Sequence, residues 1–332
     1  MTTLRIGVSF DGFSPYQDAV TFAQEAVAAG ASSLWMADHL GYREAILSCL
    51  GLALATSDVL VVPTALSPYL HHPVPTAMQM ATLAEAAPGR AALAVGIGNP
   101  LFLGEAGEKI DKPVRVMREF VEALRSLWTG EPVQQEALRF RLNGARMMFK
   151  PPQRIPIYLA PMKEQTLQLA GKIADGVVLS AGLSTNSVRW SLDQVKTGMA
   201  AGTRSGDSFR TAGYISFMAS SNERHVIDTV RQKLAFLFRN QFMADNLQRS
   251  GIVVNQQAII EAIARRDFET AASLVPDEAV ELFAVAGTVQ QCCDRLQAFG
   301  KAGLQDAVLL MAGNLEDQRY GLEVVRELSS TT

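Results

Sequence analysis

Strand-like and helix-like segments alternate along almost the whole of this 332-residue chain, and this alternation restricts its fold more than any other feature. Short apolar runs bounded by turn residues are typical of buried strands, and a segment with helical spacing of its apolar residues follows each one. The predicted strands are 4–10, 33–37, 58–62, 91–96, 155–160, 176–180, 211–219 and 306–311. Eight such units close into a parallel (β/α)8 barrel, the TIM-barrel class of α/β folds. The alternative is an open doubly wound sheet, which the strand count and the chain length disfavour.

Two segments interrupt the alternation. Near 131–154, turn residues and the Asn143-Gly144 pair predict a small hairpin with an Asn-Gly turn. Near 240–286 the chain has helical character without an obvious strand. We therefore predict a single barrel domain over 1–332 that carries a hairpin insertion and a helical insertion.

Composition excludes several classes of function. Hydrophobic residues make up 48% of the chain, and the formal net charge is −3, so nothing favours binding to nucleic acid or to an anionic membrane. No apolar run is long enough to span a bilayer, and the N-terminus has no secretory signal pattern. Cys49, Cys292 and Cys293 fit neither a zinc site nor a disulfide framework. We expect reduced thiols, no metal site and a cytoplasmic protein.

The carboxyl ends of the strands form the active-site face of a parallel barrel, so the residues that follow each strand are the candidate site. Asp38 and His39 follow strand 33–37 directly. An aspartate beside a histidine suits acid–base chemistry, although Asp38 could instead cap a helix and His39 could be structural. We expect the neighbouring pair His71-His72 to be structural, because no carboxylate lies near it in the sequence.

The other strand ends are rich in small, uncharged residues. They lack the paired carboxylates of glycosidases, a Gly-x-Ser-x-Gly elbow and a His-Glu-x-x-His helix. Small residues with exposed backbone amides suit a large planar cofactor that lies over the barrel mouth and carries the reaction itself.

Several motifs together resemble the luciferase-like monooxygenase superfamily. The motifs are residues 33–39 (SLWMADH), His72-Pro73, 88–98, 127–133, 155–160 with 170–177, and 286–288. Asp38-His39 followed by Arg43, together with Lys112-Pro113, makes the chain most similar to the methylenetetrahydromethanopterin reductase branch. The resemblance covers nearly the whole chain and is weakest over 240–285.

The resemblance implies a flavin- or deazaflavin-dependent oxidoreductase with a luciferase-like (β/α)8 barrel. Its branch implies hydride transfer between coenzyme F420 and a small organic substrate. One alternative is an FMN-dependent monooxygenase that uses O2 and a separate flavin reductase. Another is a non-catalytic flavin-binding protein. The family also implies a homodimer or a larger homo-oligomer.

The resemblance places site residues on a few positions of this chain. In the family, the histidine at the position of His39 lies against the ring. We expect Asp38 to orient His39, and these two are the catalytic candidates. The cofactor-binding candidates are Thr64 and Ala65, at a position where many relatives have a non-prolyl cis peptide, Gly98 and Asn99 in a pocket loop, and Gly176, Val177, Ser180 and Ala181 near the phosphate. Phe102 and Leu103 make the pocket loop more apolar than is usual in the pterin-reducing branch, which argues against a pterin substrate.

Overall fold

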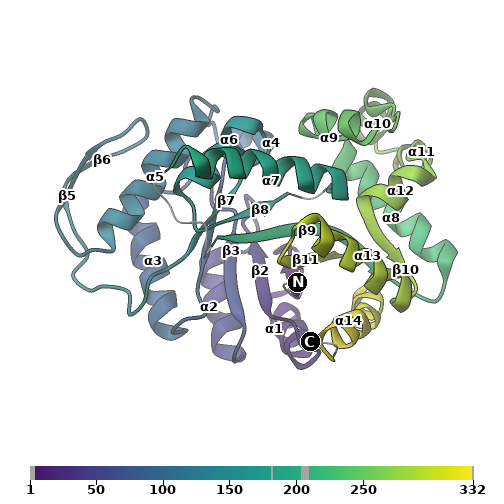
Figure 1. Cartoon of the computed structure of the whole chain (residues 1–332), viewed down its shortest axis with the longest axis horizontal. Coiled ribbons are helices and arrows are strands. Elements are labelled where there is room, and N and C mark those ends of the chain that lie inside the picture. Colours follow the sequence, from purple (N-terminus) through teal and green to yellow (C-terminus); the bar gives the residue numbers. More distant parts are fainter. Residues whose placement is uncertain (1–3, 181, 203–208, 331–332) are drawn as a thin grey trace.

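The computed structural model describes residues 4–180, 182–202 and 209–330, and eight parallel strands form a nearly closed barrel in it (Figure 1). All eight strands lie where the sequence predicts them. They are β1 Arg5–Phe10, β2 Ser33–Ala37, β3 Leu60–Thr64, β4 Leu93–Gly96, β7 Ile157–Ala160, β8 Gly176–Leu179, β9 Arg210–Ala219 and β11 Asp306–Met311. The predicted barrel class is confirmed.

Helices cover the outside of the barrel. Those of the repeating units are α1 Tyr16–Ala28, α2 Ala45–Ala55, α3 Pro73–Ala86, α5 Pro113–Leu127, α6 Glu164–Ile173, α7 Thr185–Ala200, α8 Glu223–Phe238, α13 Val289–Ala302 and α14 Leu315–Ser330. A short helix, α4 Pro100–Glu105, lies in the loop after β4 and was not predicted. Among the described residues, no helix is long and apolar enough to cross a membrane.

The barrel closes between β3 and β4 through two isolated bridges, Val61 with Ala91 and Leu66 with Val95. The two bridges are five residues apart in the segment of β3 (61 to 66) but only four apart in the segment of β4 (91 to 95). The 61–66 segment therefore has one extra residue, which forms a bulge. The bulge contains the Thr64–Ala65 peptide bond, which is cis. The bond therefore lies at the carboxyl end of the strands, as the family resemblance implies.

The hairpin insertion is present, but its turn is not where the sequence placed it. Strands β5 Val133–Glu136 and β6 Arg141–Ala145 pair antiparallel and project from one side of the molecule (Figure 1). The chain reverses at 137–140, where the Ala137 N–H donates to the Phe140 carbonyl. The prediction of an Asn143-Gly144 turn is wrong: the pair lies inside β6, opposite a register shift, and Gly144 adopts a φ of +78°.

The second insertion is mainly helical and adds one strand that the sequence did not reveal. It contains η2 Gln241–Met243, α9 Ala244–Ser250, α10 Gln256–Ala264, α11 Phe268–Ser273, α12 Asp277–Phe283 and β10 Ala284–Gly287. Strand β10 pairs parallel with β9 and lies off the barrel ring. With α8 these helices enclose a second hydrophobic cluster at one end of the molecule (Figure 1).

Large aromatic side chains fill the middle of the barrel. The fully buried Trp35 ring stacks on Tyr158 at 5.9 Å and meets Tyr214 edge-on at 6.1 Å. Two glycines leave room for these rings, because a Cβ on Gly7 would lie 2.9 Å from Trp35 Nε1 and one on Gly176 would lie 2.5 Å from the Tyr158 ring. The barrel is therefore a packed core below its mouth.

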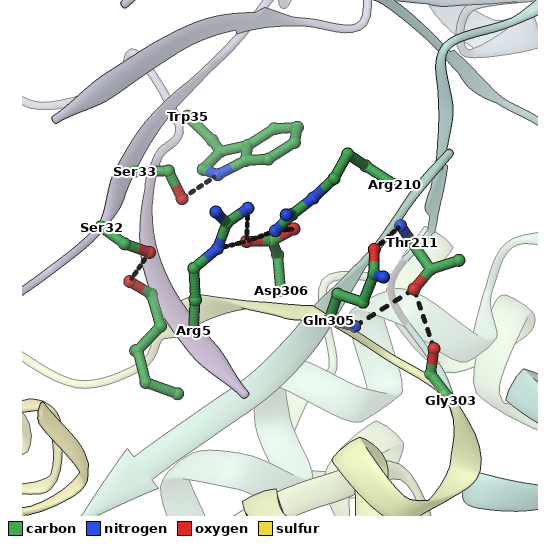
Figure 2. A network of polar contacts seen from close by, with 10 residues as sticks. Arg5, Ser32, Ser33, Trp35, Arg210, Thr211, Gly303, Gln305 and Asp306 are labelled. Atoms are coloured by element: carbon green, nitrogen blue, oxygen red, sulfur yellow. Dashed lines mark hydrogen bonds and ion pairs between the residues drawn. The ribbon is translucent and has the colours of Figure 1, made fainter. Parts of the chain in front are cut away.

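Ion pairs close the amino-terminal end of the barrel (Figure 2). Asp306 opens β11 and accepts hydrogen bonds from Arg5 at 2.8 Å and from Arg210 at 2.8 Å, each the first residue of a neighbouring strand. Burial raises the pKa of the Asp306 carboxyl, and Arg5 opposes this shift. The indole of Trp35 lies beside this network and donates to Ser33 Oγ at 2.8 Å. These charges stabilise the end of the barrel that is opposite the candidate site.

Candidate functional site

A cavity of about 340 Å³ opens at the carboxyl end of the strands. Asp38, Thr64, Gly96, Ala160 and Ser180 line it from the ends of five strands. A larger hollow of about 620 Å³ lies outside the barrel mouth, between α8, α12 and α13, and contains none of the predicted site residues. We therefore take the cavity in the barrel mouth as the candidate active site.

Small side chains form the floor of this cavity. Ala65 and Gly96 face each other across the β3–β4 seam, and a Cβ on Gly96 would lie 3.0 Å from the Ala65 Cβ and 3.3 Å from the Ala160 Cβ. Any larger residue at position 96 would rise into the cavity or push the bulge aside. The floor thus consists of small, close-packed residues and leaves room for one face of a planar ring.

Asp38 pairs with His71 and not with its sequence neighbour His39. Its carboxylate oxygen Oδ2 lies 2.7 Å from Nε2 of His71, in the loop before α3. Its backbone N–H donates to the Thr64 carbonyl at 2.8 Å, which ties the end of β2 to the cis peptide. The prediction that Asp38 orients His39 is wrong, and so is the view that His71 lacks a carboxylate partner.

His39 lines the cavity and is held by the loop after β1. Its Nδ1 lies 2.9 Å from the Asp11 carbonyl oxygen, so in the neutral ring Nδ1 carries the hydrogen. Nε2 then carries the lone pair, and no partner for it is found among the described residues. The ring stacks on Phe13 at 5.2 Å and meets Phe102 edge-on at 5.8 Å. This geometry leaves one nitrogen of His39 free to accept or donate a proton at the cavity.

Arg43 explains why the loop under His39 is fixed. Its guanidinium donates to the carbonyls of Gly12 at 2.9 Å and Phe13 at 3.1 Å. The loop that supplies the Asp11 carbonyl and the Phe13 ring is therefore anchored from the segment that follows His39. In the sequence, Arg43 was only part of the family resemblance, and nothing indicated that it positions this loop.

The loop after β4 forms one wall of the cavity. Gly98 has a φ of +97°, and a Cβ there would lie 3.0 Å from Ser67. Asn99 lines the cavity and also caps α4, because its side chain accepts the Leu101 N–H at 2.9 Å. Helix α4 presents Phe102 to the same cavity. The two predicted loop residues thus reach the site, and Phe102 makes its wall apolar.

The helical insertion supplies the opposite wall, which sequence reasoning missed. Leu237, Asn240, Phe242 and Met243 line the cavity from the end of α8 and from η2. The wall is tied to the barrel by Lys163, whose Nζ lies 3.1 Å from the Asp245 carboxylate. No sequence signal linked residues this far along the chain to the strand ends. The only available hint was Met162-Lys163, which directly follows a strand.

Some predicted cofactor residues lie elsewhere. Ser180 lines the cavity, but Gly176 and Val177 open β8 at the far end of the barrel. Val177 is fully buried against the outer helices, and Gly176 leaves room for Tyr158. Their strand is anchored there by Asp175, which accepts hydrogen bonds from Arg125 and from the Ile157 N–H. Ala181 lies outside the described residues.

The described residues contain no group of three or more His, Cys, Asp and Glu side chains that could hold a metal ion. The cavity therefore offers one carboxylate, one histidine with a free nitrogen, a floor of small residues, and walls that combine apolar side chains with Asn99, Lys163 and Asn240. Such a site suits a planar organic ring and a proton transfer beside it.

Comparison with known proteins decides the family. The family model described as luciferase-like monooxygenase matches residues 2–306. The chain belongs to the luciferase-like monooxygenase family. The superfamily that the sequence motifs indicated is confirmed.

The relatives point to one branch of the family. The chain is 29% identical over 310 residues to the 5,10-methylenetetrahydromethanopterin reductase of Archaeoglobus fulgidus, covering 92% of each chain. It superposes on the coenzyme F420-dependent tetrahydromethanopterin reductase of Methanopyrus kandleri with a TM-score of 0.89, at 24% identity and 98% coverage of both chains. A further neighbour is an F420-dependent secondary alcohol dehydrogenase in complex with an F420-acetone adduct, with a TM-score of 0.82, 20% identity and 98% coverage of both. These relatives are oxidoreductases, the predicted enzyme class.

Proposed function

We propose that this protein is an F420-dependent oxidoreductase that transfers a hydride between the deazaflavin and a small organic substrate. The observation that carries the proposal is the floor of the barrel mouth, where the Thr64–Ala65 bulge, Gly96 and Ala160 form a close-packed surface of small residues beside Asp38 and His39. The full-length similarity to an F420-linked reductase supports F420 rather than FMN as the cofactor.

The residues present fit such a ring. Thr64, Ala65 and Gly96 would lie under it, and Gly98 and Asn99 would border it from the loop after β4. The deazaflavin, when bound, supplies the hydride acceptor or donor, so that the chain has only to position it and manage a proton. His39 Nε2 is the group that accepts or releases this proton, with Nδ1 fixed by the Asp11 carbonyl. Asp38, paired with His71, places a carboxylate at the cavity wall.

The cavity walls favour a small, largely apolar substrate. Phe102 lines one side, and Phe242 and Met243 line the other. These side chains offer a large polar pterin no hydrogen bonds, so Asn99, Asn240 and Lys163 would have to supply most of them. A small substrate that carries one polar group beside His39 fits this lining better.

Three further properties belong to the same proposal. Free, buried Cys49, Cys292 and Cys293 suit a reducing, cytoplasmic location. A homodimer would cover the outward apolar face of α2, where the side chains of Leu47 and Leu54 are each 69% exposed. The barrel and the helical insertion act as one catalytic unit, because both contribute to the cavity wall.

Cofactor titration tests the proposal. Purified protein should bind F420 tightly and FMN at least tenfold more weakly, as measured by quenching of cofactor and tryptophan fluorescence. His39→Ala should retain the binding and lose most of the turnover, because general acid–base catalysis contributes about 10²–10⁴-fold. Preferred binding of FMN, with O2 consumption once a flavin reductase is added, would indicate the monooxygenase alternative. Binding of neither cofactor would refute the assignment.

A further inference from the structure

One polar group in the barrel interior has no role in the mechanism above. Tyr214 points inward from the middle of β9. The β8–β9 ladder pairs Leu179 with Gly213, so Tyr214 is the neighbour of Ser180, which lines the cavity. Its ring lies edge-on to Trp35 at 6.1 Å. Tyr214 is thus placed directly below the floor of the candidate site.

The hydroxyl of Tyr214 is buried and unpaired. It is inaccessible to solvent, and no hydrogen-bond partner of acceptable geometry is found for it among the described residues. The hydroxyls of Thr64, on β3, and of Ser9, on β1, lie close enough to lower the pKa of Tyr214 as hydrogen-bonding groups do, although neither meets the geometry of a hydrogen bond. Burial raises the pKa of Tyr214 far above its usual range, and the two hydroxyls only partly oppose this, so the group stays protonated. An unpaired buried hydroxyl is unfavourable and calls for an explanation.

Thr64 is the residue through which this hydroxyl can act. Thr64 forms one half of the cis peptide under the cavity, and it lines the cavity itself. Its hydroxyl donates to the Val62 carbonyl at 3.1 Å, which leaves the oxygen lone pairs free to accept a further hydrogen bond. Tyr214 is therefore a donor without an acceptor, next to an acceptor with spare capacity.

We propose that Tyr214 is a positioning residue of the cofactor site: its hydroxyl donates to Thr64 when a planar ring lies on the Thr64–Ala65 bulge, so that it stabilises the loaded barrel more than the empty one. The inference rests on the proposed function, since it requires a flavin-type ring in the barrel mouth. Tyr214 contacts neither the ring nor the substrate and acts through the bulge.

The experiment compares Tyr214→Phe with Tyr158→Phe. Tyr158 also packs against Trp35, at 5.9 Å, and does not line the cavity, so it is a matched control for the loss of a buried phenol. We expect Tyr214→Phe to weaken F420 binding about fivefold, which corresponds to about 1 kcal/mol, and to shift the absorption maximum of the bound cofactor. The unfolding of the empty variant in urea should occur at an unchanged or higher urea concentration. Tyr158→Phe should alter neither the affinity nor the spectrum.

Thr64→Val provides a second, independent route to the same conclusion. If the two hydroxyls act as a pair, the double variant should bind F420 no more weakly than Thr64→Val alone. Equal affinity of wild type and Tyr214→Phe, or additive losses in the double variant, would overturn the inference while leaving the proposed function intact. The inference would also be overturned if the cofactor-free Tyr214→Phe protein lost as much free energy of unfolding as it lost free energy of F420 binding, because that result would show a purely structural role. Failure of the wild-type protein to bind F420 or FMN would refute the proposed function itself, and the inference with it.

Discussion

At the scale of single residues, the two side chains that follow β2 are held by different loops. Asp38 and His39 are consecutive, yet Asp38 pairs with His71 from the loop before α3 and His39 with the Asp11 carbonyl. Consecutive residues at a strand end leave the chain in different directions, so each meets a different neighbouring loop. The positions of Asp38, Thr64 and Asn99 could be predicted from the strand ends alone. Their partners depend on how the loops fold back, which no local pattern encodes.

The two adjacent histidines allow a matched test of this arrangement. His71→Asn removes the imidazole that pairs with Asp38 at 2.7 Å and leaves a half-buried carboxylate without that partner. We expect turnover to fall about tenfold or more, because loss of a charge-assisted hydrogen bond costs about 1.5–3 kcal/mol. His72 caps α3 instead, with Nδ1 accepting the Val74 N–H, and asparagine is a good N-cap. His72→Asn should therefore retain nearly full activity in the same steady-state assay. Equal effects of the two changes would contradict a role for His71 at the site.

At the scale of elements, period and turn chemistry predicted most of the fold. All eight barrel strands follow from short apolar runs, because a strand of a parallel barrel is buried on both faces. The position of the hairpin turn and strand β10 could not be predicted in this way. Asn143-Gly144 has the composition of a hairpin turn, but the register of β5 and β6 makes it a bulge. Strand β10 has only four residues between two helices, and its strand character comes from pairing with β9.

Helix α2 carries a prediction about assembly. Its sequence is apolar on all sides, and the buried side faces the barrel while Leu47 and Leu54 project outward. We expect a homodimer that covers this face, and Leu54→Glu should weaken it at least tenfold, because it would bury an unpaired charge. Sedimentation velocity over a range of concentrations measures this shift. Val253→Glu is the control, since Val253 is an exposed apolar residue on the helical insertion. A wild-type protein that sediments as a monomer would exclude the dimer.

At the scale of the whole molecule, the two ends of the barrel differ in how their polar groups are satisfied. Asp306 and Asp175 at the amino-terminal end are each held by two arginines. At the mouth, His39 Nε2 and the Tyr214 hydroxyl are without partners in the described part of the chain. The carboxylates of the amino-terminal end are thus paired, although Arg210 Nε is buried there without a hydrogen-bond partner among the described residues. At the other end, His39 lines the cavity, and its Nε2 remains available for a ligand. The location of the site at the carboxyl ends of the strands follows from the barrel topology and could be predicted, whereas the identity of its unpaired groups could not.

A buried thiol and a buried phenol should make the stability of the folded protein decrease at alkaline pH. Burial raises the pKa of Cys292 to about 12 and that of Tyr158 to about 12, above the values of about 8.5 and 10 for unfolded chains. At a pH between the unfolded and the folded pKa of a group, the unfolded chain has lost the proton of that group and the folded chain has kept it. The free energy of unfolding should therefore fall as pH rises, by at most about 1.4 kcal/mol per pH unit for each group. Cys292→Ala removes one of the two groups. Urea unfolding at pH 8 to 11 should therefore show a stability difference between wild type and variant that shrinks with rising pH, and a constant difference would contradict the burial effect.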